Sequence, residues 1–345
     1  MNKSETKLTF RTLGFMMLFV VILGGIVFSF PSLLAFSIQQ EQKQITSAML
    51  DQFPVTVDPK NKIIVENVRV NAFFENDPSP FQAAVENTGN ALWGVFELIA
   101  TTIAKAPLYQ GLAGVAGINN RFVTITAGMR KEQVASAFAK ALVWNSAQKQ
   151  EFMTKGKYSS LPLLEGSFSP GVYVVDRGTT PIAVQALVNK RFSDEILDHY
   201  GTATAQIVPL DQALTIASLI EREAGGPDDM RIISGIIWNR LFNNMNLQID
   251  ATLQYAKANS KTITSWWPKV LPADIFRKSP YNTYQNKGLP PTPIANPSVA
   301  AVLAALNPKN TFCVFYFHDN AGQFHCTNTY TEHVALLKKY FGRGK

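Results

Sequence analysis

An uncharged apolar run close to the N-terminus constrains the fold of this chain more than any other feature. Residues 13–36 contain no Asp, Glu, Lys or Arg. At about 1.5 Å of rise per residue, a helix over this run is longer than a hydrocarbon core of about 30 Å. A cleaved signal peptide has a shorter apolar region of about 7–15 residues. The run therefore predicts an uncleaved transmembrane helix.

The basic residues around this run predict its orientation. Lys3, Lys7 and Arg11 precede it, whereas Lys43 is the nearest basic residue after it. By the positive-inside tendency, residues 1–12 form a cytoplasmic tail. We therefore expect a single-pass protein of the cytoplasmic (inner) membrane whose folded portion is exoplasmic.

The exoplasmic portion is long enough for two folded domains. The chain has 345 residues, of which 46% are hydrophobic and 17% charged, so it can bury a sizeable core. The net charge of +7 comes from scattered residues, without a Lys/Arg run that alternates with aromatic residues. We therefore expect no nucleic-acid partner, and a mildly basic surface suits an anionic polymer outside the membrane.

Two acids at the end of an apolar helix are the first candidates for chemistry. Residues 210–223 predict a helix that is apolar around most of its circumference and carries one polar stripe, formed by Asp211, Thr215, Ser218 and Arg222. Glu221 and Glu223 flank this stripe, near apolar neighbours and at the negative end of the helix dipole. Both effects disfavour the ionised carboxylate and raise its pKa, as a general acid requires. Spacing alone still favours a simpler interpretation, a solvated charge cluster before Gly225.

Several sequence strings resemble the YceG-like family of endolytic murein transglycosylases. They occur in the family's order and approximate spacing, and they are ASLIEREAG, IIWNRL, MNLQIDATLQY, SPYNTY and KGLPPTPIANPS. RFVTITAGMRKEQVASAFAKAL and LLEGSFSPGVYVV are weaker matches upstream, so the resemblance covers roughly residues 121–340. The resemblance implies that Glu223 is the catalytic acid/base, whereas Glu221 matches a glutamate of less defined role.

The reaction implied by the resemblance is cleavage of the MurNAc-GlcNAc bond of peptidoglycan strands to give 1,6-anhydroMurNAc ends. One acid/base suffices because the muramyl C6 hydroxyl is the nucleophile, and no cofactor is needed. Cell-wall synthesis enzymes are candidate protein partners. Two alternatives are a catalytically silent peptidoglycan-binding scaffold and an ordinary two-carboxylate glycoside hydrolase that pairs Glu223 with Glu221 or Asp250.

Polar residues after the catalytic helix are candidates for substrate binding. Asn239 offers both a donor and acceptors to a sugar amide, although a structural cap is an equal alternative. Gln248 and Asp250 would point the same way from an extended segment, whereas Asp250 could instead cap a helix over residues 251–257.

A rigid loop rich in proline and glycine supplies a second group of candidates. Its aromatic side chains could present flat faces to pyranose rings, with packing as the alternative. The candidates in this loop are Tyr281, Asn282, Thr283 and Tyr284.

Cysteine and histidine spacing predicts no metal site. Cys313 and Cys326 flank a predicted hairpin, and two separate thiols in strands are expected rather than a disulfide. The four histidines form no HExxH or paired ligand spacing.

Two positions depart from the family pattern. Gly171 follows Pro170 where relatives carry an aspartate, and Phe324 stands where relatives carry a histidine, with His325 one residue later. These departures leave any role of those side chains open.

We expect an α+β fold in five parts. They are a cytoplasmic tail (1–12), a transmembrane helix (13–36), a membrane-proximal α/β region with a LysM-like domain as one interpretation (37–120), a small α/β subdomain (121–205) and the catalytic domain (206–345). Residues 91–107 are too short and too charged for a second span, so a buried or interfacial helix is expected there.

Overall fold

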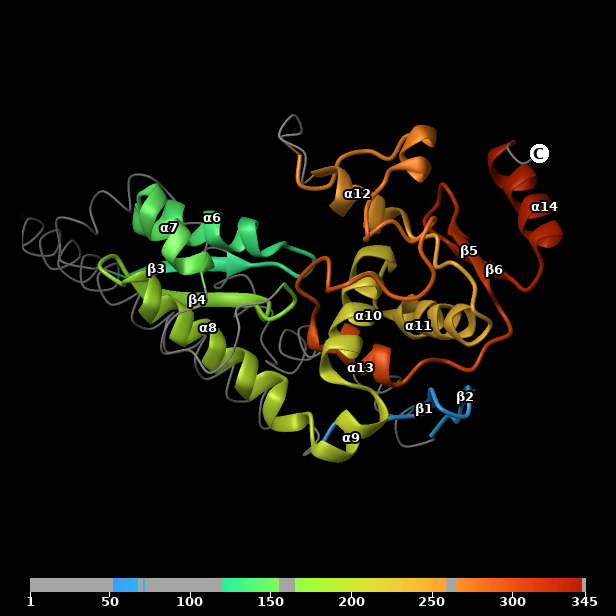
Figure 1. Cartoon of the computed structure of the whole chain (residues 1–345), viewed down its shortest axis with the longest axis horizontal. Helices are drawn as coiled ribbons and strands as arrows, with labels where there is room; N and C mark the ends of the chain where they lie inside the picture. The colour runs from blue at the N-terminus through green and yellow to red at the C-terminus, as the bar shows by residue number, and fades with distance from the viewer. Residues whose placement is uncertain (1–51, 68–70, 72–119, 155–164, 259–264, 343–345) are drawn as a thin grey trace, which may run out of the picture.

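The computed structural model describes residues 52–67, 71, 120–154, 165–258 and 265–342 (Figure 1). No helix within these ranges is long and apolar enough to cross a membrane. The predicted transmembrane run and the helix expected over residues 91–107 lie outside the described residues.

The first unit is an antiparallel strand pair with helices packed on one face. Strand β3 (Asn120–Ile125) pairs with β4 (Gly171–Asp176), and Val123 lies opposite Tyr173. Val123 and Ile125 are buried while Thr124 is exposed, as the two-residue period of a strand requires. The helices that cover the buried face are α6 (Lys131–Leu142), α7 (Ser146–Met153) and α8 (Pro181–Glu195).

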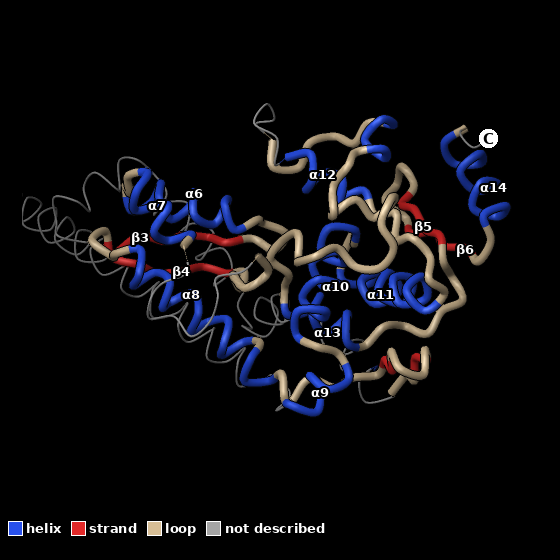
Figure 2. Tube along the Cα trace, in the orientation of Figure 1, coloured by secondary structure: helices blue, strands red, loops and turns tan. Residues whose placement is uncertain are grey.

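The second unit is built around one buried helix, α10 (Leu210–Glu223). Every residue from Ala213 to Ile220 is buried, and α11 (Pro227–Phe242) and α13 (Val299–Leu306) pack against it (Figure 2). The prediction of a helix enclosed on nearly all sides is confirmed. The helix ends where Ala224 turns to extended backbone.

The remaining described elements lie around these three helices. They are β1 (Val57–Asp58), β2 (Ile63–Ile64), η1 (Leu197–His199), α9 (Thr202–Ile207), α12 (Asp250–Ala258), η2 (Pro272–Phe276), β5 (Phe315–His318), β6 (Phe324–Thr327) and α14 (Tyr330–Phe341). In the described part of the chain, the strands form antiparallel pairs β1-β2, β3-β4 and β5-β6. This mixture confirms the predicted α+β class.

A disulfide joins Cys313 to Cys326, with 5.7 Å between their Cα atoms. The expectation of two separate thiols is therefore wrong. His318 pairs with Phe324, so residues 319–323 form the connecting loop. The N–H of Val314 donates to the carbonyl of Thr327 at 2.9 Å. Tyr316 lies opposite Cys326 in the β5-β6 register, so the disulfide ties β6 to the chain just before β5.

Asn296 connects the two units. It is fully buried, its Oδ1 accepts the N–H groups of Gly166 and Phe168 at 3.1 and 3.0 Å, and its Nδ2 donates to the carbonyl of Met129 at 2.8 Å. Because a buried amide needs all these partners, Asn296 holds the first unit in a defined position beside the end of α10. Sequence reasoning did not identify this residue, although it lies within KGLPPTPIANPS.

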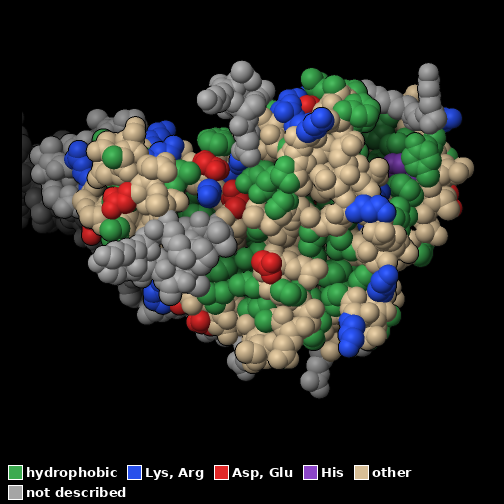
Figure 3. Space-filling view, in the orientation of Figure 1, with side chains coloured by type: hydrophobic (Ala, Val, Ile, Leu, Met, Phe, Trp, Pro, Cys, Tyr) green, Lys and Arg blue, Asp and Glu red, His purple; other side chains and the backbone are tan. Residues whose placement is uncertain are grey.

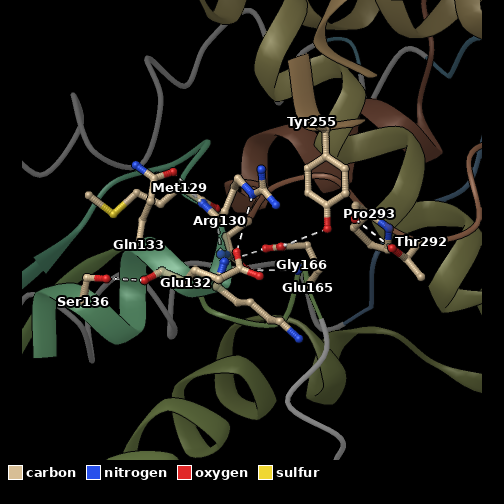
Figure 4. Close-up of polar contacts among 12 residues, drawn as sticks. Met129, Arg130, Glu132, Gln133, Ser136, Glu165, Gly166, Tyr255, Thr292 and Pro293 are labelled. Atoms are coloured by element: carbon tan, nitrogen blue, oxygen red, sulfur yellow. Dashed lines mark hydrogen bonds and ion pairs between the residues drawn. The ribbon is translucent and has the colours of Figure 1, made fainter. Parts of the chain in front are cut away.

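A carboxylate cluster lies at the same junction (Figure 4). The N–H of Lys131 donates to Glu165 Oε1 at 2.8 Å, and the Tyr255 hydroxyl donates to Oε2 at 3.5 Å. The Arg130 guanidinium lies 4.1 Å from the centre of the Tyr255 ring. Burial raises the pKa of Glu165 to about 8, and the charge of Glu132 adds to that rise. The junction therefore contains an acid that is largely protonated at neutral pH.

Candidate active site

Glu223 is the last residue of α10 and lies where α10, β5 and the start of α12 meet. The Tyr316 hydroxyl, from β5, donates to Glu223 Oε2 at 2.8 Å. The backbone N–H of Ala251, in the first turn of α12, also interacts with the Glu223 carboxylate, and Asp250 lies near enough to act on its charge. A carboxyl group at the end of a buried helix is thus held by a strand from one side and a helix start from the other.

The protonation of Glu223 is set by opposing effects. Burial is the largest effect and raises the pKa of this carboxyl group, and the nearby charge of Asp250 raises it further. The Tyr316 hydrogen bond, the Ala251 N–H and the charge of Arg222 lower it. Burial outweighs them, so the pKa of Glu223 is above the ordinary glutamate value, as the apolar neighbours in the sequence predicted.

Arg240 holds the two segments that reach Glu223. Its Nε donates to the carbonyl of Val314 at 2.6 Å, just before β5, and its Nη1 donates to the carbonyl of Leu247 at 2.7 Å, just before α12. Neither Arg240 nor Tyr316 was singled out from sequence. The run of aromatic residues in FYFH was the available signal for Tyr316. This run does not show which ring faces a helix from a distant part of the chain.

Asp250 and Tyr284 form a second polar pair near Glu223. The Tyr284 hydroxyl donates to Asp250 Oδ1 at 2.7 Å, and burial raises the pKa of this tyrosine above its ordinary value. Asp250 is the first residue of α12 and is exposed. Gln248 has a φ of 53°, so the segment is not extended there as expected, and its Oε1 accepts from Arg240 Nη1 at 3.2 Å.

Glu221 and Asn239 are engaged with distant backbone. Glu221 Oε2 accepts the N–H and hydroxyl of Ser298 at 3.0 and 2.7 Å, at the start of α13. Asn239 Nδ2 donates to the carbonyls of Thr311 and Cys313 at 2.6 and 3.0 Å. These contacts tie α10 to α13 and α11 to the chain before β5.

The SPYNTY loop is held by its own buried polar groups. Asn282 is fully buried and donates to the carbonyls of Ile275 and Arg277 at 3.0 and 2.8 Å. Thr283 is also buried, and its hydroxyl accepts the N–H of Ile249 at 3.0 Å. Tyr281 is half-buried, with its ring centre 4.8 Å from that of Tyr255. Within this loop, Tyr281 and Tyr284 thus remain partly accessible, whereas the two residues between them shape the loop.

The structure shows the local contacts of Phe324 and Gly171, the two positions that depart from the family pattern. Phe324 stacks on Tyr316 with ring centres 5.8 Å apart, so it packs beside the residue that holds Glu223. His325 instead contacts Asp319 Oδ2 at 2.8 Å, in the hairpin loop. Gly171 has a φ of 136°, and a Cβ there would collide with the Arg191 guanidinium. The backbone conformation therefore disfavours a side chain at that position, and the Arg191 guanidinium would have to move to admit one.

Charge and metal-ligand residues are dispersed in the part of the chain that the structure describes. Lys and Arg side chains do not gather into one patch on the face shown in Figure 3. No group of three or more His, Cys, Asp or Glu side chains is placed to hold a metal ion within the described ranges.

The family can now be assigned. The model of the YceG-like family matches residues 76–339, which include both units and every candidate residue above. The chain belongs to the YceG-like family. The family resemblance found in the sequence strings is therefore confirmed.

Similar proteins include named enzymes and one solved structure. An endolytic murein transglycosylase from Bacillus subtilis (strain 168) is 30% identical over 239 residues, which are 63% of this chain and 64% of that protein. An endolytic murein transglycosylase from Streptococcus pneumoniae is 29% identical over 174 residues, 49% of this chain and 31% of that protein. A crystal structure of a putative YceG-like protein from Listeria monocytogenes matches with a TM-score of 0.54 and 27% identity, over 62% of this chain and 75% of that one. The chain thus spans less than two thirds of the length of the named enzymes.

Proposed function

We propose that this chain is a membrane-anchored endolytic murein transglycosylase with Glu223 as its acid/base. The observation that carries the proposal is the Glu223 carboxyl group, which has a raised pKa and accepts a hydrogen bond from Tyr316. Membership of a family with relatives named endolytic murein transglycosylase supports the choice of peptidoglycan as substrate.

Glu223 would act twice in the reaction. Protonated Glu223 first gives its proton to the oxygen that links MurNAc C1 to GlcNAc C4, and the C1–O bond breaks. The muramyl C6 hydroxyl then bonds to C1 and gives its proton to the Glu223 carboxylate. The products are a 1,6-anhydroMurNAc end and a GlcNAc end with a free 4-hydroxyl. The proton that leaves Glu223 is thereby restored, so one residue completes the cycle.

The surrounding residues would hold this carboxyl group and the sugar. The Tyr316 hydroxyl, which donates to Glu223 Oε2, and the Ala251 N–H would together orient the Glu223 carboxyl group toward the glycosidic oxygen. Asp250, Gln248, Tyr281 and Tyr284 are the partly accessible groups proposed for sugar contacts. We propose that Glu221, Asn239, Asn282 and Thr283 act indirectly, because their polar atoms bind other parts of the chain.

A two-carboxylate hydrolase is the second candidate. Asp250 lies near enough to raise the pKa of Glu223, so it could serve as the second carboxylate. A hydrolase would leave reducing MurNAc ends in place of anhydro ends.

The proposed location is the exoplasmic face of the cytoplasmic membrane, with residues 13–36 as anchor and residues 1–12 inside. Residues 121–205 and 206–345 are the proposed small and catalytic domains, and cell-wall synthesis enzymes are the proposed protein partners. The location rests on the apolar run and its flanking charges.

Product analysis tests the proposed reaction. The purified full-length chain is incubated with peptidoglycan glycan strands, and the new ends are identified by mass spectrometry. We expect anhydro ends whose formation depends on Glu223. Reducing ends would establish the hydrolase instead, and strands left intact by a folded protein would leave only a binding role.

A further inference from the structure

Arg222 lies beside Glu223 and forms no ion pair with any residue that the structure describes. Its guanidinium carbon lies 4.0 Å from the centre of the Trp267 ring. It makes no hydrogen bond and no salt bridge with any residue that the structure describes, and its Nε is enclosed without a partner. The terminal nitrogens are not among the enclosed atoms, so they reach solvent.

Residues from both units hold the Arg222 guanidinium in position. Trp267 supports one face, and Gly128 of the first unit approaches Arg222 closely. A Cβ at Gly128 would lie 3.1 Å from Arg222 Nη1 and 3.4 Å from its Cδ. Gly128 also has a φ of 79°, which side chains rarely adopt. The close approach of backbone and aromatic ring restricts the side chain before any ligand arrives, which lowers the entropic cost of binding.

The neighbouring acids act on the charge of Arg222 without pairing with it. Glu221 Oε2 accepts from the Ser298 N–H and hydroxyl instead of from Arg222, and burial keeps the Glu223 carboxyl group protonated to a higher pH than usual. A half-buried guanidinium without an ion pair is costly unless a ligand supplies the counter-charge. A guanidinium that is stacked on a ring keeps its edge free, and this edge matches the two oxygens of a carboxylate.

We propose that Arg222, supported by Trp267, binds a carboxylate group of the substrate beside the acid/base residue. This inference rests on the proposed peptidoglycan substrate, whose carboxylates are those of the stem peptide or, where the peptide has been removed, of the lactyl group. The site would thereby distinguish muramyl-containing strands from neutral N-acetylglucosamine polymers.

Binding of three small sugars to the full-length chain tests the inference without any cleavage. GlcNAc-MurNAc-peptide carries carboxylates on the peptide, GlcNAc-MurNAc carries a free lactyl carboxylate, and N,N′-diacetylchitobiose (below, chitobiose) carries none. Neither muramyl probe contains the MurNAc-GlcNAc bond, so each stays intact. Dissociation constants are measured by calorimetry for wild type, Arg222→Gln and Arg222→Lys. Arg177→Gln is the charge control, because Arg177 is exposed in the first unit.

We expect Arg222→Gln to weaken binding of at least one muramyl probe by about tenfold or more, and to leave chitobiose binding unchanged. If Arg222→Gln weakens only the binding of GlcNAc-MurNAc-peptide, the carboxylate that Arg222 binds belongs to the stem peptide. If it weakens the binding of GlcNAc-MurNAc, that carboxylate belongs to the lactyl group. Arg222→Lys should retain part of the affinity, and Arg177→Gln all of it. Equal weakening of all three probes, or none, would overturn the inference. The cleavage assay tests the proposed reaction separately. Failure of the proposed carboxylate binding can therefore be distinguished from failure of the proposed reaction.

Discussion

Replacing Glu223 by glutamine removes proton transfer and keeps the shape of the side chain. The amide carbonyl can still accept the hydrogen bond that Tyr316 donates at 2.8 Å to the native carboxyl group. The variant also removes a carboxyl group whose ionised form is disfavoured by burial. We therefore expect the free energy of unfolding to stay within about 1 kcal/mol of wild type.

The rate should fall far more than the stability. General acid–base assistance is worth roughly 10²–10⁴-fold, and the upper part of this range applies because one carboxyl group serves both steps. A loss of about 10⁴-fold corresponds to about 5.4 kcal/mol of transition-state stabilisation, at 1.36 kcal/mol for each factor of ten. Release of anhydro ends, followed over time by mass spectrometry, measures this loss directly.

Glu221→Gln is the matched control, with the same substitution two positions earlier on α10. Glu221 accepts both donors of Ser298, so its replacement should cost about 1 kcal/mol of stability and leave most of the activity. A folded Glu223→Gln protein that formed anhydro ends at nearly the wild-type rate would refute the assignment and make Glu221 the candidate.

The pH dependence of the wild-type rate follows from the same carboxyl group. The first step needs protonated Glu223, and burial raises its pKa, so the rate should fall as the pH rises through a midpoint above the ordinary glutamate value. A rate that stayed constant far into the alkaline range would show that another group delivers the proton.

Three further perturbations test the surroundings of the site. Tyr316→Phe removes a hydrogen bond that lowers the pKa of Glu223. The alkaline limb of the pH–rate profile should therefore move to higher pH, and the plateau rate should fall. An unchanged alkaline limb would contradict this role of Tyr316. The pKa of Glu165 is raised from 4.5 to about 8, so the folded state binds more protons than the unfolded state between these values and wild-type stability should decline as the pH rises through them. Glu165→Gln should reduce that decline in thermal unfolding measured across this range. Replacing Cys313 and Cys326 together by serine should cost about 3 kcal/mol of unfolding free energy in denaturant titrations, because the bond closes a chain segment with a sequence separation of 13.

The local elements were readable from sequence because each is specified by its own residues. The apolar residues around α10 predicted both its extent and its burial. The raised pKa of Glu223 also followed from sequence, since its apolar neighbours lie on the same helix. Periodicity determines such features because the interacting residues are adjacent along the chain or one turn apart.

Tertiary structure alone decided which distant residues meet at Glu223. Tyr316 is 93 positions further along the chain, and Arg240 helps to hold the chain just before the strand that carries it. The disulfide depended likewise on how the chain before β5 folds beside β6, and the contacts of Asn296 depended on the docking of two units. Residue spacing carries no information about these contacts, because they arise when separate elements pack and satisfy each other's buried polar groups. The sequence by itself therefore determined the helix that carries the acid, and packing determined the residues that control it.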